Sequence, residues 1–125
     1  MAEYRECECG GILFLDEADG VCRCNNCCTE FKMPNNVLQH KAICNEMNIL
    51  YERKNRDYGD SFHTSYLEER MAMARIRLGD KLNRFKTLTK GEQQMVNDES
   101  IRDTLMDLAN YSIMAIMELD REAQE

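Results

Sequence analysis

The sequence has 125 residues, enough for one modest domain and a small attached module. Its formal net charge is −7, and this argues against nucleic-acid binding over the whole surface, which requires an excess of Lys and Arg. A local basic patch for one small phosphorylated ligand remains compatible with that charge. No apolar stretch is long enough for a membrane span, and the first residues lack the pattern of a secretion signal. We therefore expect a cytosolic protein without a membrane partner.

Six of the seven cysteines lie within residues 7–28. A reducing compartment and an odd number of cysteines both argue against a disulfide framework. Two short pairs of thiols on either side of a potential hairpin are typical of a tetrahedral zinc site. We predict that residues 1–33 form a zinc ribbon with a short β-hairpin, and that the metal is structural because four thiolates leave no open coordination position.

The cluster offers more thiols than one zinc ion requires. The ligands that we predict are Cys7, Cys9, Cys24 and Cys27. Cys22 and Cys28 are alternative ligands, and the spacing of Cys24 and Cys27 also fits a redox pair. Cys44 stands apart from the others, and we expect it to be a core residue of a helix.

Residues 34–125 are rich in helix-forming side chains and contain a single proline, at their start. We predict a mainly α fold in which residues 34–125 form a helical bundle. Helices are expected over residues 34–56, 62–89 and 98–122. Gly59 and Gly91 lie between these helices, where glycine permits the backbone to change direction.

The apolar periodicity of the helices predicts the core and a partner surface. On residues 62–89 the predicted core stripe is Leu67, Met71, Ala74, Leu78, Leu82 and Phe85, and the predicted contact residues beside it are Ala72, Met73 and Ile76. The last helix has a wider apolar face that includes Ile101, Leu105, Leu108, Ala115, Ile116 and Leu119. This much apolar surface predicts a homo-oligomer, a dimer or larger.

The last helix also carries an acidic arc. At about 100° per residue, four polar side chains fall within about 80°: Glu99, Asp103, Asp107 and Asn110. Carboxylates at this spacing repel one another unless cations lie nearby. Mg²⁺ prefers oxygen ligands and often joins carboxylates to substrate phosphates, so the arc favours a magnesium site.

A basic face on the preceding helix complements this arc. Arg77, Lys81 and Arg84 share it with Asp80, and Lys54 occupies a position on the first helix where packing alone favours an apolar residue. A polar turn that includes Asp57 follows Lys54, and the whole arrangement predicts a phosphate site. The simpler alternative is that the acidic and basic faces only form interhelical salt bridges. Both histidines, His40 and His63, are expected to be ordinary polar residues.

Three segments carry a family resemblance: KNRDYGDSF at residues 54–62, RLGDKLNRF at 77–85 and DESIRDTLMDLANY at 98–111. In this order they resemble the phage-associated nucleotide modification associated domain 1 family, which is similar to the MazG-like all-alpha nucleotide pyrophosphatases. The resemblance covers about residues 46–120. It implies a helical bundle, dimeric or higher, that binds a nucleoside triphosphate through Mg²⁺ and releases a monophosphate and pyrophosphate. It also implies the host cytoplasm if a phage encodes the chain.

In this hypothesis Mg²⁺ is held by Asp80, Asp103 and Asp107 with help from Glu99. The phosphates are bound by Lys54, Arg77, Lys81 and Arg84, beside Asp57 and Asn110. The sequence departs from the MazG-like Glu-x-x-Glu and Glu-x-x-Asp pairs, because the matching regions read Arg77-x-x-Asp80 and Thr104-x-x-Asp107. A nucleotide-binding or sequestering protein without turnover, of the phage anti-defence type, and a zinc-ribbon adaptor are the alternatives.

Overall fold

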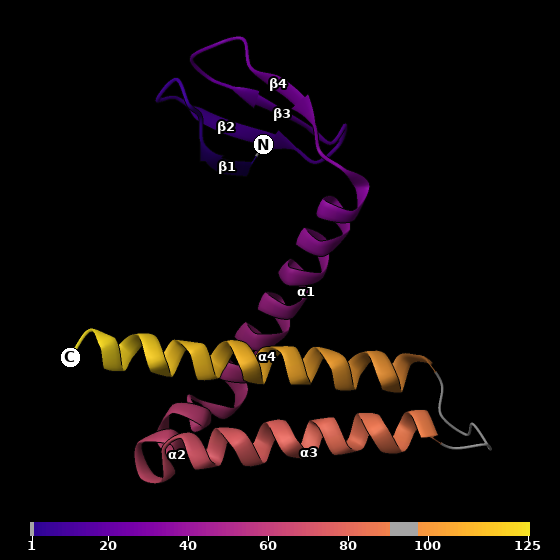
Figure 1. Ribbon diagram of the computed structural model, residues 1–125, viewed down its shortest axis with the longest axis vertical. Helices are drawn as coiled ribbons and strands as arrows, with labels where there is room; N and C mark the ends of the chain where they lie inside the picture. Colours follow the sequence, from indigo (N-terminus) through magenta and orange to yellow (C-terminus); the bar gives the residue numbers. More distant parts are fainter. Residues whose placement is uncertain (1, 91–97) are drawn as a thin grey trace. The chain divides into compact units, whose positions relative to one another are not determined.

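The computed structural model describes residues 2–90 and 98–125, and of residues 98 and 99 only the backbone is described. Four strands are followed by four helices in the described chain (Figure 1). The strands are β1 (Ala2–Glu6), β2 (Ile12–Asp16), β3 (Val21–Cys24) and β4 (Glu30–Lys32). The helices are α1 (Asn35–Tyr58), α2 (Ser61–Glu69), α3 (Met71–Lys90) and α4 (Asp98–Ala123). The predicted mainly α fold with a small β element is therefore confirmed.

The chain divides into two compact units, Met1–Glu46 and Met47–Glu125, and the division falls inside α1. We refer to them as the sheet unit and the helical unit. The sequence predicted domains over residues 1–33 and 34–125. In the structure the first half of α1 belongs to the sheet unit, because Leu38 packs against the core of the sheet.

The sheet is antiparallel throughout, with the strands in the order β1-β2-β3-β4. Only a short hairpin was predicted, whereas β1 and β4 add a strand at each edge. Side chains alternate across β2, so that Leu13 and Leu15 are buried. Leu15 lies opposite Cys22 on β3, and these two residues form the core of the unit together with Met33. The core is small, as expected for a unit of this size.

The helical unit is built around α3 and α4, which run side by side in opposite directions (Figure 1). Lys81 contacts Asp107 and Arg84 contacts Thr104, which fixes the antiparallel register of the pair. The core cluster of the unit consists of Phe62, Tyr66, Met73, Ala74 and Ala115.

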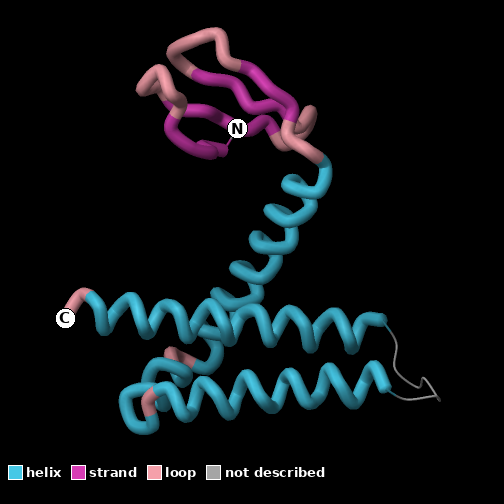
Figure 2. The backbone as a smooth tube through the Cα atoms, viewed as in Figure 1, coloured by secondary structure: helices cyan, strands magenta, loops and turns pink. Residues whose placement is uncertain are grey.

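The predicted helix over residues 62–89 is interrupted at Arg70, which separates α2 from α3 (Figure 2). Arg70 has φ 56°, a left-handed conformation that side chains other than glycine rarely adopt. Its backbone N–H donates to the carbonyl oxygen of Tyr66 at 2.8 Å and ends α2. The single-helix prediction was wrong because neither glycine nor proline marks the break. Burial of Phe62 and Tyr66 on α2 provides the tertiary contacts that stabilise the interruption.

The distribution of apolar side chains differs from the predicted core stripe. Met73, expected to be a contact residue, is buried, whereas Leu67, expected in the core, is 54% exposed. Leu82, Leu105, Ile116 and Leu119 are also exposed. Cys44, another predicted core residue, is only half-buried and lies near His40. None of the helices in the described residues combines the length and the hydrophobicity of a membrane-crossing helix.

Candidate functional site

Two tight turns of the sheet unit bring four thiols together. The Sγ atoms of Cys7, Cys9, Cys24 and Cys27 all lie within 4.8 Å of one another. The Sγ atoms of Cys7 and Cys27 are 3.8 Å apart, and those of Cys9 and Cys24 are 3.5 Å apart. A tetrahedral site with Zn–S bonds of about 2.3 Å requires sulfur atoms about 3.8 Å apart. The four thiols could therefore hold a metal such as zinc.

Backbone N–H groups donate to the sulfur atoms of Cys9, Cys24 and Cys27, and such hydrogen bonds favour the thiolate form that binds metal. Gly11 N–H donates to Cys9 Sγ at 3.3 Å, and this bond, with a further one from Asn26, lowers the pKa of Cys9. The hydroxyl and the backbone N–H of Thr29 lower the pKa of Cys27 to about 6. The N–H groups of Cys27 and Asn26 likewise favour ionisation of Cys24, but burial and the thiols of Cys9 and Cys27 outweigh them and raise its pKa to about 11.

Gly11 is required by the close approach of the two turns. A Cβ atom on Gly11 would lie 2.6 Å from Cβ of Asn26 and 3.0 Å from Sγ of Cys24. Gly10, before it, has φ 87°, which allows the first turn to form.

The structure separates the four clustered cysteines from the alternatives. Cys22 is fully buried beside Leu15 in the sheet core, and Cys28 is exposed outside the cluster. The four thiols predicted as ligands are thus the four that the fold brings together.

The helical unit contains a cavity of about 370 Å³. Its wall is formed by the end of α1, the turn into α2, and one side each of α3 and α4. The aromatic part of the wall consists of Tyr51, Tyr58, Phe62 and Tyr111. The charged and amide groups are those of Lys54, Asn55, Asp60, Arg77, Asp107 and Asn110. A concave site with an apolar wall and a few converging polar groups is typical of a small-molecule site.

Asp107 lies at the centre of the charged wall and contacts two lysines. Lys54 Nζ donates to Oδ1 of Asp107 at 3.2 Å, and Lys81 Nζ donates to Oδ2 at 2.9 Å. Burial raises the pKa of Asp107, but the two ammonium groups outweigh this effect and the pKa lies below its ordinary value. The acidic arc of α4 therefore contacts basic side chains at Asp107, through ion pairs with a lysine of α1 and a lysine of α3.

Some of the other residues predicted to bind the phosphates line the cavity, and the rest lie outside its wall. Arg77 lines the cavity, and its Nε donates to the thioether sulfur of Met73 at 3.2 Å. No carboxylate of the described residues lies within ion-pair distance of its guanidinium. Asn110 also lines the cavity and donates to the carbonyl oxygen of Met47 at 3.4 Å. Arg84 instead donates to Thr104 outside the cavity wall, and Asp57 is exposed outside it as well.

Of the predicted magnesium ligands whose side chains are described, Asp107 alone lines the cavity. Asp80 and Asp103 are exposed, do not line it, and form no ion pair or hydrogen bond with the residues that the structure describes. The side chain of Glu99 lies outside the described residues. The carboxylates of the described cavity wall, Asp60 and Asp107, each face a cation already. This donor set does not fit a magnesium ion, which prefers several oxygen ligands free of competing cations.

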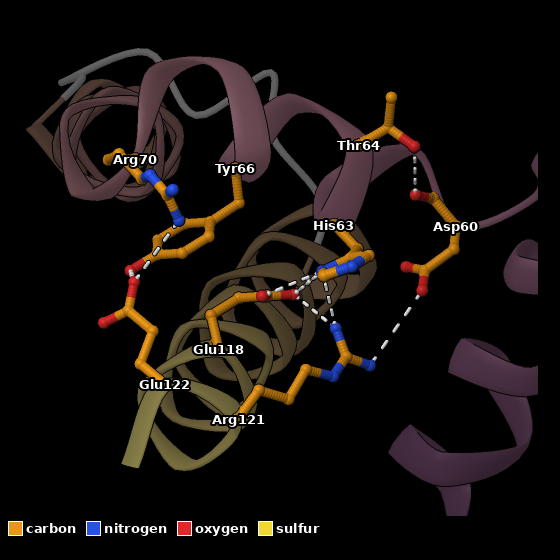
Figure 3. A network of polar contacts seen from close by, with 8 residues as sticks. All are labelled: Asp60, His63, Thr64, Tyr66, Arg70, Glu118, Arg121 and Glu122. Atoms are coloured by element: carbon orange, nitrogen blue, oxygen red, sulfur yellow. Dashed lines mark hydrogen bonds and ion pairs between the residues drawn. The ribbon is translucent and has the colours of Figure 1, made fainter. Parts of the chain in front are cut away.

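A second polar cluster, beside the cavity, was missed by the sequence analysis (Figure 3). Its centre is Glu118 on α4, which is only 3% exposed. The carboxylate accepts from Arg121 Nη1 at 2.6 Å and contacts Nδ1 of His63 at 2.9 Å. Arg121 Nη1 also lies 2.8 Å from Nδ1 of His63. One Nδ1 atom cannot donate to Glu118 and accept from Arg121 at the same time, so the proton is best placed on Nδ1, facing the carboxylate. His63 is therefore a structural partner of a buried charge, and the signal was a glutamate within an apolar helix face.

Tyr66, Arg70 and Glu122 continue this cluster toward the end of α4. The hydroxyl of Tyr66 donates to Glu122 at 2.7 Å, and this bond raises the pKa of Tyr66. Arg70 lies over the Tyr66 ring and 3.7 Å from Glu122. These contacts attach α2 to α4 (Figure 3). At the other end of α2, Arg121 lies 3.9 Å from Asp60, a residue of the cavity wall.

Comparison with protein-family models places this cavity within a known domain. The model described as nucleotide modification associated domain 1 matches residues 54–119, which include α2, α3 and most of the cavity wall. No match was found among the curated proteins or the solved structures. The match covers more than half of the chain and begins at Lys54, one of the two lysines on Asp107. The chain therefore belongs to the nucleotide modification associated domain 1 family.

Proposed function

We propose that the cavity of the helical unit binds a nucleoside phosphate. The observation that carries this proposal is that Lys54 and Arg77 line the cavity beside an aromatic wall, while Lys81 joins Lys54 in neutralising Asp107. With Asp107 neutralised by the two lysines and Asp60 beside Arg121, the guanidinium of Arg77 favours an anionic group, and the aromatic side chains of the wall favour a planar ring.

The phosphate is expected at Arg77 and Lys54, which line the cavity, and Lys81 adds positive charge through its contact with Asp107. Among the described residues Arg77 has only a thioether partner, so its planar guanidinium is the best placed group for bidentate contact with phosphate. Lys54 is more than half exposed and can turn from Asp107 toward a ligand. Asp107 then serves to hold the lysines at the cavity when no ligand is bound.

The nucleobase is expected against the aromatic wall. Phe62 and Tyr111 already stack on each other with ring centroids 6.0 Å apart. Tyr58, in contrast, is 76% exposed at the cavity mouth, so a base can cover its ring. Burial of that ring would contribute to affinity for the nucleoside as well as for its phosphate.

A second candidate function is the Mg²⁺-dependent cleavage of a nucleoside triphosphate to a monophosphate and pyrophosphate. Asp103 favours it, because this exposed carboxylate lies one helical turn before Asp107 on α4. The described carboxylates do not form a magnesium site by themselves, so we infer binding as the primary function and turnover as the outcome to be tested.

We also propose that Cys7, Cys9, Cys24 and Cys27 hold a structural zinc ion, which would make the sheet unit a zinc ribbon. The support is the agreement of the sulfur separations with tetrahedral coordination. This ion would stabilise the fold and leave no position for a substrate.

The test of nucleotide binding is calorimetric titration of the full chain with nucleoside mono-, di- and triphosphates, with and without Mg²⁺, alongside an assay for released pyrophosphate. Arg77→Gln should weaken binding by about tenfold or more, as expected for loss of a charged hydrogen bond. Arg75→Gln is the matched control, because Arg75 is an exposed arginine of α3 outside the cavity wall. Equal loss in both variants, or no binding by the wild type, would refute the site.

Asp107→Asn separates the two candidate functions. If Asp107 only holds Lys54 and Lys81, removing its charge frees both lysines and binding of a phosphate becomes tighter. If Asp107 holds Mg²⁺ for turnover, pyrophosphate release and the Mg²⁺ dependence of binding are both lost in this variant.

A further inference from the structure

The charged part of the cavity wall has an excess of positive charge. Lys54 Nζ and Lys81 Nζ lie 3.2 and 2.9 Å from the two carboxylate oxygen atoms of Asp107, so these three side chains together carry one positive charge. Arg77 adds a second positive charge, and its partner among the described residues is an uncharged thioether sulfur. An anion at this part of the wall therefore meets an excess of two positive charges.

Lys81 contributes to this excess although it does not line the cavity. Its Nζ lies 6.0 Å from the centre of the Tyr111 ring, and Tyr111 belongs to the aromatic wall. The ammonium group therefore acts on the cavity from directly behind the wall, where water screens it less than in bulk solution. Asp60, the other described carboxylate of the wall, lies 3.9 Å from Arg121 and forms no ion pair with the two lysines or with Arg77.

An excess of two positive charges matches one phosphoryl group. A phosphate monoester carries a charge of about −1.5 to −2 at pH 7. The planar guanidinium of Arg77 can bind two of its oxygen atoms at once, and the ammonium group of Lys54 lines the same cavity. A second or third phosphate would bring more negative charge, and the described wall has no further cation to offset it.

A magnesium ion commonly offsets this additional charge when a protein binds a nucleoside triphosphate. The family resemblance implies such an ion, but the described carboxylates do not fit it. Asp107 is already paired with two lysines, and Asp80 and Asp103 lie outside the cavity wall. The described wall therefore suits a nucleotide whose charge needs no metal ion to offset it.

The size of the cavity agrees with a small nucleotide. Its volume of about 370 Å³ is near the lower end of the range of about 300 to 1,000 Å³ that is typical of small-molecule sites. A base, a sugar and one phosphate can use both the aromatic and the charged residues of the wall. Further phosphates would need room beyond these residues.

We propose that the cavity selects a nucleoside monophosphate and binds it without Mg²⁺. This inference rests on the proposed function, because it specifies which nucleotide the same site takes. It differs from the triphosphate with Mg²⁺ that the family resemblance implies. Since the selectivity comes from matching of charge, it should change when the charge of the wall is changed.

The first test is calorimetric titration of the full chain with the common ribo- and deoxyribonucleosides and with their 5′-mono-, di- and triphosphates, each with and without Mg²⁺. No chelator is added, because it would also compete for metal at the four clustered thiols. In at least one series the monophosphate should bind about tenfold or more tighter than the free nucleoside and the triphosphate, and Mg²⁺ should change its affinity by less than about twofold.

The outcomes of this titration distinguish the inference from the proposed function. A triphosphate with Mg²⁺ that binds tighter than every monophosphate would overturn the inference and leave nucleotide binding intact. Release of pyrophosphate in the presence of Mg²⁺ would overturn it as well. If no nucleotide binds, or if every free nucleoside binds as tightly as its monophosphate, the proposed phosphate site itself is refuted.

Asp107→Asn tests whether matching of charge sets the selectivity. The variant removes one negative charge beside the two lysines, so it should favour the diphosphate more than the monophosphate. The preference for the monophosphate over the diphosphate should fall by about threefold or more. Asp80→Asn is the matched control, because Asp80 is an exposed aspartate of α3 outside the cavity wall, and it should keep the wild-type preference. Circular dichroism establishes that both variants are folded. A folded Asp107→Asn variant with the wild-type preference would overturn the proposal.

Discussion

The sheet unit and the helical unit both have small cores, but they differ in what else can stabilise them. The core cluster of the sheet unit has three buried side chains, those of Leu15, Cys22 and Met33. The helical unit buries five residues in its core cluster and leaves large apolar side chains such as Leu105 and Ile116 exposed. The sheet unit gathers four thiols instead. A short chain with a small core can gain stability from a bound metal ion, and in this chain the sheet unit has the thiols that could hold one.

The largest expected effect is the unfolding of one unit while the other stays folded. Cys7→Ser, or removal of metal with a strong chelator, should unfold the sheet unit and leave the helical unit folded. Structural zinc sites contribute on the order of 10 kcal/mol to folding, far more than the three-residue core can replace. The measurement is the amide NMR spectrum together with bound zinc per chain. Cys28→Ser is the matched control, because Cys28 is exposed outside the cluster. Persistence of the β2 and β3 signals in metal-free Cys7→Ser would contradict the comparison.

A smaller effect is expected within the helical unit from Glu118→Gln. The buried carboxylate holds both Arg121 and His63, and its loss should cost about 2 to 3 kcal/mol of unfolding free energy. Urea unfolding followed by helical circular dichroism provides the measurement. Glu122→Gln should cost less than about 1 kcal/mol, because Glu122 is much more exposed. Equal costs for the two variants would show that burial of Glu118 is not the deciding factor.

Gly11→Ala tests whether a change in the sheet unit leaves the stability of the helical unit unaffected. The added Cβ atom meets Asn26 and Cys24 and must move one cysteine turn relative to the other, at a cost of about 1 to 2 kcal/mol. We expect weaker zinc binding in a competition assay with a chelating dye. The helical unit should unfold at the same urea concentration as in the wild type, and a shift of that transition would show that the two units are not independent.

The smallest effect concerns Asp107 and depends on pH. Its pKa is lower in the folded chain than its ordinary value of 3.8, so its ion pairs stabilise the fold above that pH and the stabilisation is lost as the pH falls through the folded pKa. Asp107→Asn should cost about 1 kcal/mol at pH 7 and progressively less below pH 4. Asp80→Asn removes an exposed aspartate without a described partner, so it should leave the free energy of unfolding unchanged both at pH 7 and below pH 4. A constant cost for Asp107→Asn at pH 7 and pH 3 would contradict the assignment.

The local features of the molecule could be predicted from the sequence, and the tertiary ones could not. The thiol set follows from short spacings within turns, and the helix ends outside the break at Arg70 fall within a few residues of their predicted positions. The break itself has no local signal, because contacts of α2 with α4 stabilise it. Edge strands β1 and β4 were missed because pairing with the hairpin, and not their own short sequences, defines them.

The candidate site shows the same limit. Helical spacing correctly places Asp103 and Asp107 on one arc of α4, but it does not determine which neighbouring helix covers that arc. Packing of α3 and the end of α1 brings Lys54 and Lys81 to Asp107 and leaves Asp103 exposed. The wide apolar face of α4 could likewise be predicted from the sequence. Which of its residues stay exposed could not be predicted, because that depends on which helices pack against it.

The several roles of α4 determine how freely its sequence can diverge among relatives. Asp107 and Tyr111 line the cavity, Glu118 anchors α2, and Met106 and Ala115 are buried, so most turns of α4 carry at least one constrained residue. Helix α3, in contrast, exposes positions such as Arg75 and Lys86 to water. We expect a saturation mutagenesis screen for folded chains to find far fewer neutral substitutions in α4 than in α3. Drift among relatives should then concentrate on α3 and in the sheet unit outside its four clustered thiols.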